Sequence, residues 1–385
     1  MKRIEYFLCM GCGRNCFVLE NENVIYEINY CNVMKQHFLK SSLNVACAIL
    51  ISLISNIYTF AQAYSNPYAA IDNWATLPNG RIFGAIGGMD IDPDGEHIWV
   101  IIRCDATADS QLGSACLNSD LDPVLKFDSN GKVVKSFGAG MFIWPHSLEL
   151  DPEGNIWVTD AVKSKFIPEG DKRGHQVIKF SNSGEVLMVL GTPGEEGNDE
   201  KHFNQPSDVV VAENGDIFIA DGHALEGNNR IVKFDSSGRY IKAWGKTGYA
   251  PGEFRMPHAI DIDRRGRIFV CDRFNNRIQL FDQDGNFINQ WTQFGRPSDV
   301  FFDHLDNIYV ADSESDNVQN PGWEMGIRIG DAHLGWVHHF IKLPTGDPRV
   351  IKGNGAEFIA VDKEGNIYGG EAATQKLIKY VRVRP

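Results

Sequence analysis

Two histidines and one glutamate occupy comparable places in the sequence and could together bind a metal ion. His146 and His258 each follow a proline, in WPHSLEL and MPHAIDI, and Glu357 opens the similar segment EFIAVD. A catalytic transition metal needs three such protein ligands and an open position. We therefore predict a divalent metal, zinc or alternatively iron, bound by His146, His258 and Glu357. The alternative is that each histidine only hydrogen-bonds a nearby loop.

Three further residues could bind or convert a substrate beside that ion. Arg103 and Arg273 directly follow the apolar segments IWVII and IFVCD, and guanidinium groups recognise carboxylates. His223, in the loop DGHALEGNN, could act as a base or an acid near neutral pH. We predict catalytic roles for Arg103, His223 and Arg273. Surface salt bridges for the arginines and a solvated loop position for the histidine are the alternatives.

These residues belong to a repeated sequence unit. Three segments align without a gap: HSLELDPEGNIWVTD (146–160), SDVVVAENGDIFIAD (207–221) and HAIDIDRRGRIFVCD (258–272). Weaker copies span 87–102, 298–312 and 357–371. Each copy has two strand-like segments around a polar turn, and most are followed by two more. Six units of four antiparallel strands predict an all-β fold, a six-bladed β-propeller of NHL-type repeats.

The propeller fold would bring the candidate residues to one rim of the central channel. The first strand of each blade lines the channel. The residues that open these strands are Gly87, His146, Ser207, His258, Ser298 and Glu357. The three possible metal ligands fall in alternate blades, about 120° apart around the axis. The second strands return to the same rim, which places Arg103, His223 and Arg273 beside them.

The ring also needs a closing strand, because the last repeat has only three strand-like segments. The segment AAIDNWATLPNG, near residue 70, resembles the fourth strands IKAWGK and INQWTQ of other units. Trp74 would then take the place of Trp244 and Trp291. We predict that this N-terminal segment completes the last blade and removes the free sheet edges.

The first 63 residues predict export. From Met34, a lysine-bearing stretch precedes the apolar run LNVACAILISLISNIYTF and the small-x-small sequence AQA that ends at Ala63. This order is typical of a cleavable secretory signal. We predict translation from Met34, cleavage after Ala63, and a secreted or periplasmic propeller over residues 64–385. The alternative is an uncleaved membrane anchor, because the run is almost long enough to span a bilayer.

Charge and cysteine content add two expectations. The formal net charge of −13 opposes binding to phosphate backbones, so we expect no nucleic acid partner. We separately expect a monomer. Cys104 and Cys116 could form a disulfide within one loop of an exported protein. Cys271, inside the strand-like segment IFVCD, is expected to be a buried free thiol.

From about residue 75 onward, the sequence resembles the NHL-repeat propellers, and among them the peptidyl-α-hydroxyglycine α-amidating lyases. The segments that carry the resemblance are WPHSLELDPEGNIWVTD, HFNQPSDVVV, FIADGH, NNRIVKF and PGEFRMPHAIDIDRRGRIFVCDRFNNRIQLF. The resemblance implies a catalytic zinc held by three channel histidines, arginines that bind the substrate carboxylate, and a tyrosine base. On matching positions it implies zinc binding by His146 and His258, and active-site roles for Arg103 and Arg273.

The chain departs from this family pattern at three positions, and it also lacks the family's disulfide cysteines. Glu357 stands in place of the third histidine, Phe358 in place of an aspartate used for structural calcium, and His223 in place of the tyrosine. A set of two histidines and one glutamate can still bind zinc or ferrous iron. The phenylalanine disfavours the structural calcium.

The leading functional prediction is an exported, metal-dependent lyase. Its substrate would be a small molecule or peptide C-terminus that carries a carboxylate and an α-hydroxyglycine-like carbinol, cleaved to an amide and glyoxylate. A propeller without enzymatic activity that binds protein or glycan is the second possibility. A lactonase-type hydrolase is the third, but its funnel would hold calcium, for which two histidines are poor ligands.

Overall fold

The computed structural model of the chain describes residues 64–104, 115–342 and 355–383. The predicted signal and its cleavage site lie outside these residues. Tyr64–Pro385 forms one compact unit. Among the described residues, no helix has both the length and the apolar character that a membrane crossing requires.

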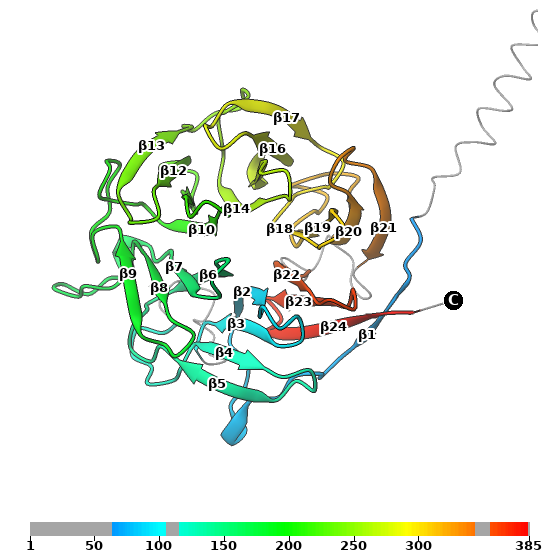
Figure 1. The fold of residues 1–385 in the computed structure, drawn as a ribbon, viewed down its shortest axis with the longest axis horizontal. Coiled ribbons are helices and arrows are strands. Elements are labelled where there is room, and N and C mark those ends of the chain that lie inside the picture. Colours follow the sequence, from blue (N-terminus) through cyan, green and yellow to red (C-terminus); the bar gives the residue numbers. More distant parts are fainter. Residues whose placement is uncertain (1–63, 105–114, 343–354, 384–385) are drawn as a thin grey trace, which may run out of the picture. The chain divides into compact units, whose positions relative to one another are not determined.

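The described residues form six four-stranded antiparallel sheets, arranged as blades around a central channel (Figure 1). The first three blades comprise β2 (Ile86–Ile91), β3 (Ile98–Ile102), β4 (Val124–Phe127) and β5 (Val133–Phe137); β6 (Pro145–Leu150), β7 (Ile156–Asp160), β8 (Gln176–Phe180) and β9 (Val186–Leu190); and β10 (Pro206–Val211), β11 (Ile217–Asp221), β12 (Arg230–Phe234) and β13 (Tyr240–Trp244).

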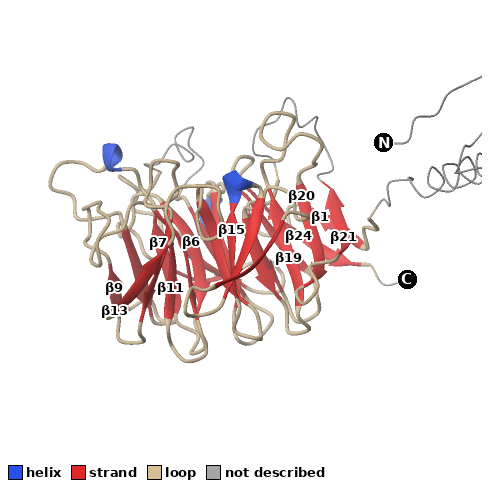
Figure 2. Ribbon diagram, turned by 90° about the horizontal axis from the view of Figure 1, so that it is seen from above, coloured by secondary structure: helices blue, strands red, loops and turns tan. Residues whose placement is uncertain are grey.

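The other three blades comprise β14 (Pro257–Ile262), β15 (Ile268–Asp272), β16 (Arg277–Phe281) and β17 (Phe287–Trp291); β18 (Asp299–Phe302), β19 (Asn307–Asp312), β20 (Gly326–Asp331) and β21 (Val337–Lys342); and β22 (Phe358–Val361), β23 (Ile367–Glu371), β24 (Lys376–Arg382) and β1 (Tyr68–Ile71). Short 3-10 helices are η1 (Pro78–Gly80), η2 (Ser164–Phe166) and η3 (Arg273–Asn275). In each blade the strand named first is innermost, and loops connect the strands on both sides of the ring (Figure 2). The predicted all-β six-bladed propeller is confirmed.

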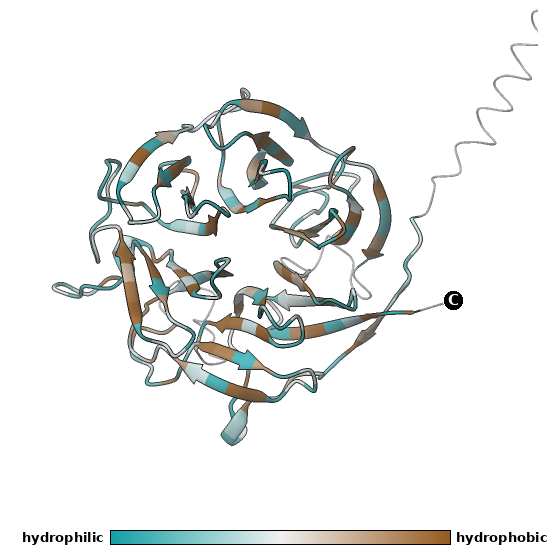
Figure 3. Ribbon diagram, in the orientation of Figure 1, coloured by the Kyte–Doolittle hydropathy of each residue, from teal (hydrophilic) through white to brown (hydrophobic). Residues whose placement is uncertain are grey.

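The hydrophobic core lies between the blades. One apolar cluster fills each of the six contacts between neighbouring blades, and the strands carry most of the apolar residues (Figure 3). Between the third and fourth blades, for example, Phe218 and Ile231 pack against Ile260 and Val270. Because a single blade cannot bury both faces, the ring is the unit that removes this surface from water.

The N-terminal segment closes the ring, as the sequence predicts. β1 pairs antiparallel with β24, with Tyr68 opposite Arg382 and Ile71 opposite Lys379. β1 is therefore the outer strand of the last blade. The strand begins earlier than the predicted segment and ends at Ile71, before a turn in which Asn73 has a φ of 58°.

Trp74 lies beyond that strand but still occupies the predicted position. Its ring contacts Tyr368 of the last blade and Phe127 of the first, with centroids 4.9 and 6.2 Å away. Trp244 makes the corresponding contacts, with Phe218 of its own blade at 6.2 Å and Phe281 of the next blade at 6.0 Å. Trp74 thus packs between the last and the first blade.

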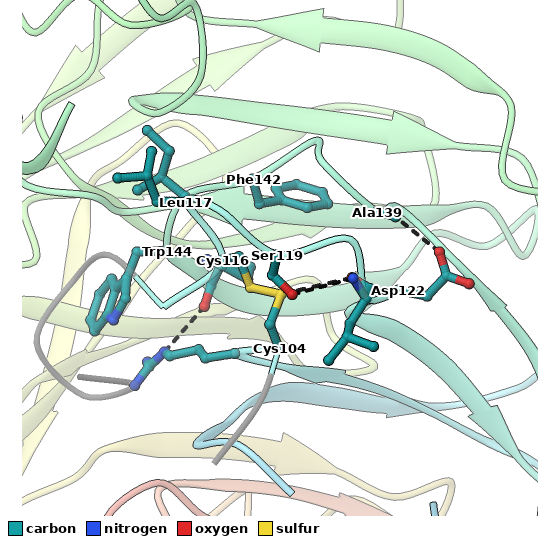
Figure 4. Close-up of a disulfide and its surroundings, with 12 residues drawn as sticks. Cys104, Cys116, Leu117, Ser119, Asp122, Ala139, Phe142 and Trp144 are labelled. Carbon is teal, nitrogen blue, oxygen red and sulfur yellow. Dashed lines mark hydrogen bonds between the residues drawn. A yellow bond between two sulfur atoms is a disulfide. The ribbon is translucent and has the colours of Figure 1, made fainter. Parts of the chain in front are cut away.

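The predicted disulfide is present. Cys104 and Cys116 are joined, with their Cα atoms 5.4 Å apart, and Cys271 is a buried free thiol. The bridge lies in the loops at one side of the ring, close to Trp144 (Figure 4). The backbone N–H of Cys116 donates to the carbonyl oxygen of Ile143, so the bridge ties the end of β3 to the loop that carries Trp144.

Candidate functional site

His146 and His258 lie at corresponding irregularities of the inner strands. The pairing of β6 with β7 shifts between Pro145 and Leu148, and the pairing of β14 with β15 shifts between Pro257 and Ile260. Such a β-bulge bends the strand and redirects its side chains, and bulges are frequent beside active sites. The same shift occurs in the first and third blades, between Ile86 and Met89 and between Pro206 and Asp208, so it belongs to the repeat, and the two histidines occupy it in the second and fourth blades.

A buried aspartate fixes the loop in front of each histidine. Asp160 accepts hydrogen bonds from the backbone N–H groups of Ile143 and Trp144, at 2.8 and 2.9 Å. Asp272 accepts one from the N–H of Arg255 at 2.7 Å. Both carboxylates are fully buried, so these bonds replace water and hold the loop in one conformation.

Backbone carbonyls set the orientation and tautomer of both imidazoles. His146 Nδ1 donates to the carbonyl oxygen of Ser207 at 2.7 Å, and His258 Nδ1 donates to that of Ser298 at 2.6 Å. The proton is therefore on Nδ1, and each Nε2 presents a lone pair. Both Nε2 atoms, and both ring nitrogens of His223, are buried without a hydrogen-bond partner.

The three imidazoles form one cluster. Ring centroids are 4.2 Å apart for His146 and His223, 4.8 Å for His146 and His258, and 5.0 Å for His223 and His258. One possible coordinating atom from each histidine lies within 4.8 Å of the other two. Burial lowers the pKa of His146 and His223 well below the usual value and also lowers the pKa of His258. The rings are thus neutral at neutral pH, as a metal ligand must be.

Glu357 lies beside His258 at a separation that suits a shared ion. Its Oε1 is 3.2 Å from His258 Nε2 and 3.0 Å from Arg273 Nη1. Two ligands of one tetrahedral zinc are about 3.3 Å apart, because each is about 2.0–2.1 Å from the metal. Burial alone would raise the pKa of Glu357, but the neighbouring His258 and Arg273 lower it well below its usual range. The ionised oxygen accepts a hydrogen bond when His258 Nε2 carries a proton, and a cation between the two atoms would take the place of that proton.

Arg103 and Trp144 form a cationic group on another side of the cluster. The guanidinium lies over the indole ring, 3.9 Å from its centroid, and its Nε donates to the carbonyl oxygen of Pro145. Arg103 Nη2 and Trp144 Nε1 are buried without partners. Burial lowers the pKa of Arg103 to about 10, so the group stays charged at neutral pH. Two unfilled donors around one buried cation suit an anion.

Arg273 has a different environment, because carboxylates already surround it. Besides Glu357, it has Glu314 Oε1 at 3.5 Å from Nη2, and Glu314 Oε2 is 3.0 Å from Arg296 Nε. Glu314, Arg296 and Trp144 are site residues that the sequence did not predict. Glu314 lies two places beyond Asp312, as His223 lies two places beyond Asp221, so the same position in the fifth repeat was the available signal.

The structure gathers all six predicted residues at one end of the channel. His146, His223 and His258 share a cluster, Glu357 and Arg273 adjoin His258, and Arg103 reaches it through Trp144, whose ring centroid is 5.3 Å from that of His146. Phe358 packs against the rings of His146 and His258, at 5.3 and 5.8 Å. Metal binding and catalysis by these residues stay predictions.

Comparisons with known proteins agree with the fold and the resemblance. A family described as a 6-bladed β-propeller matches residues 196–294. The chain is 36% identical over 209 residues to peptidyl-glycine alpha-amidating monooxygenase B of Xenopus laevis, covering 50% of the chain and 22% of that protein. It is 30% identical over 273 residues to peptidyl-alpha-hydroxyglycine alpha-amidating lyase 1 of Drosophila melanogaster, covering 66% of the chain and 47% of that protein. It is 37% identical over 125 residues to human NHL repeat-containing protein 3, covering 32% and 34%.

Each match therefore spans less than half of the relative's length. Among solved structures, virginiamycin B lyase from Staphylococcus aureus superposes with a TM-score of 0.50 at 14% identity, covering 82% of the chain and 98% of that structure. At that identity the similarity concerns the fold alone. The sequence relatives confirm the resemblance to amidating lyases and NHL-repeat proteins at 30–38% identity.

Proposed function

We propose that this propeller is a metal-dependent lyase that cleaves an α-hydroxyglycine-like substrate to an amide and glyoxylate. The observation that carries the proposal is the convergence of unpartnered, buried ring nitrogens from His146, His223 and His258, with Glu357 beside them. A buried polar atom without a partner costs free energy, and a metal ligand set has a reason to keep such atoms unpaired. The names of the relatives indicate the reaction.

In the proposed reaction, His146, His258 and Glu357 would hold the ion and His223 would move the proton. When bound, a divalent ion acidifies the substrate hydroxyl and stabilises negative charge on its oxygen. Neutral His223 accepts the hydroxyl proton as the carbon–nitrogen bond breaks and the carbon–oxygen double bond of glyoxylate forms. The same proton then passes to the departing amide nitrogen, so that no other reactant is consumed.

Groups at the edge of the histidine cluster would bind the substrate. Arg103 would anchor the carboxylate of the substrate, with Trp144 Nε1 as a second donor. The rings of Trp144 and Phe358 line the histidine cluster, with the indole 5.3 Å from His223. They would limit access of water to the reacting atoms, and this lowers the local dielectric and strengthens each charge interaction.

The proposal predicts a metal-dependent activity that can be removed and restored. The purified protein should contain about one divalent transition metal per chain by elemental analysis. It should release glyoxylate from an N-acyl-α-hydroxyglycine, lose this activity after chelation, and recover it with zinc. A protein with neither stoichiometric metal nor glyoxylate release would instead be a propeller that binds protein or glycan.

We also propose that the propeller is exported after removal of residues 1–63. The disulfide between Cys104 and Cys116 supports an oxidising compartment, because reducing compartments keep such thiols free. N-terminal sequencing of the protein recovered from the periplasm or medium should give Tyr64 as the first residue. Recovery of residues 34–63 on a membrane-bound product would contradict cleavage and indicate a tethered propeller.

A further inference from the structure

The two arginines of the site are unequally neutralised. Arg273 Nη1 lies 3.0 Å from Glu357 Oε1, and its Nη2 lies 3.5 Å from Glu314 Oε1. Among the described residues, no carboxylate forms an ion pair with Arg103, although the charge of Glu357 acts on it from farther away. Its Nε donates to the carbonyl oxygen of Pro145, and its Nη2 is buried without a hydrogen bond. Arg273 also keeps one buried donor without a partner, its Nε. A ligand carboxylate thus meets one guanidinium whose two Nη atoms already contact carboxylates and one that has no carboxylate contact.

We infer that Arg273 is a positioning residue for Glu357, and that Arg103 anchors the single carboxylate of the ligand. The inference rests on the proposed function, because it divides roles within that same site. It differs from the role implied by the resemblance, in which both arginines belong to the substrate-binding machinery.

Charge compensation supports this division. Arg296, Glu314, Arg273 and Glu357 form a chain of alternating charges that ends at His258, with contacts of 3.0, 3.5, 3.0 and 3.2 Å. Both arginines of this chain are almost fully buried, with 2% and 4% of their surface exposed. A carboxylate that binds a metal is commonly held by a hydrogen bond from a second residue, and Arg273 is placed to give it.

Arg103 is as buried as the arginines of the chain, with 3% of its surface exposed, but no carboxylate contacts it in the described structure. A buried cation with unfilled donors gains more from an anion than one already paired, because the pairing replaces water lost on burial. Glu357 consequently acts as a built-in counter-ion. It limits the site to ligands with one carboxylate, because a second one would have to displace it from Arg273.

Anion binding without metal or turnover tests this assignment. The purified protein is freed of metal by chelation and dialysis, then titrated calorimetrically with acetate and with malonate, succinate and glutarate. The unmodified protein should bind no dicarboxylate more than about threefold more tightly than acetate. Glu357→Gln should bind at least one dicarboxylate about tenfold more tightly or better, because Arg273 Nη1 becomes available, while acetate, which has a single carboxylate, should gain less.

Four variants provide the controls. Adding Arg273→Gln to Glu357→Gln should abolish the gain, and Arg103→Met should abolish acetate binding. Glu314→Gln, which frees Arg273 Nη2, should give a smaller gain in dicarboxylate affinity. It replaces Glu357→Gln in the titration if Glu357→Gln lowers the melting temperature. The inference is overturned if Arg273→Gln alone weakens acetate binding as much as Arg103→Met, or if neither glutamate variant gains dicarboxylate affinity. These results do not depend on lyase activity, so the inference and the proposed function can fail separately.

Discussion

Alanine at His146 or His258 is expected to remove the bound metal and to lower glyoxylate release by about a thousandfold or more. Each histidine is fully buried and held by a hydrogen bond to a backbone carbonyl, which fixes the position of its Nε2, and alanine supplies no coordinating atom there. A thousandfold loss corresponds to about 4 kcal/mol of transition-state stabilisation, within what a metal ion supplies. Elemental analysis and a glyoxylate assay on the same preparations measure both effects.

The matched controls are Ser207→Ala and Ser298→Ala. These serines hold the two imidazoles through their backbone carbonyl oxygens, which alanine retains. Metal content should therefore stay at the level of the unmodified protein, and activity should change little. If the serine variants lost metal as fully as the histidine variants, the losses would reflect damage to the channel and not the removal of ligands.

Three further variants separate the roles of His223 and Glu357. His223→Ala should retain the metal and lose activity if His223 is the base, whereas loss of metal would make it a ligand. Glu357→Ala should lose metal, and Glu357→His should retain it, because imidazole is a good zinc ligand. Unchanged metal content in Glu357→Ala would remove the carboxylate from the ligand set and leave the three histidines as its members.

The sequence repeat predicted the fold and the position of the site, because both depend on how the six repeats align and on which residue of each repeat begins the inner strand. Once six copies were aligned, each inner strand had a defined first residue, and His146 and His258 fell at the same place in alternate blades. The structure adds a physical reason that alignment does not contain. A bulge at that place turns the side chain toward the channel, and a buried aspartate at the end of the second strand fixes the loop before it.

The pairing of charges could not be predicted in the same way. Glu357 reaches Arg273 across 84 positions of sequence, and Glu314 and Arg296 complete the chain through side-chain conformations that a strand register does not define. Long charged side chains have several rotamers, and their choice depends on every neighbour at once. The same limitation explains why Arg103 was predicted but its contact with Trp144 was not.

The second prediction with a large expected effect concerns the pairing of β1 with β24, which closes the ring. A variant that lacks residues 64–84 is expected to aggregate or to lose its cooperative unfolding transition. The deletion removes β1 and exposes the backbone of β24 as an unpaired edge, which other chains can extend. It also removes Tyr68 from the cluster between the fifth and sixth blades, and Trp74 from the cluster between the sixth and first.

The size of the loss follows from the burial of these aromatic side chains. Tyr68 is 8% exposed, and deleting a buried aromatic residue costs about 3–5 kcal/mol, a large part of the 5–15 kcal/mol that stabilises a typical domain. The protein that begins at Tyr64 keeps β1 and is the reference, while Trp74→Ala keeps the strand and should lose only a few degrees relative to it. Size-exclusion chromatography and thermal unfolding distinguish these cases. If the chain without residues 64–84 stayed monomeric with an unchanged melting temperature, β1 would not be what holds the last blade to the first, and the contacts between neighbouring blades alone would keep the ring closed.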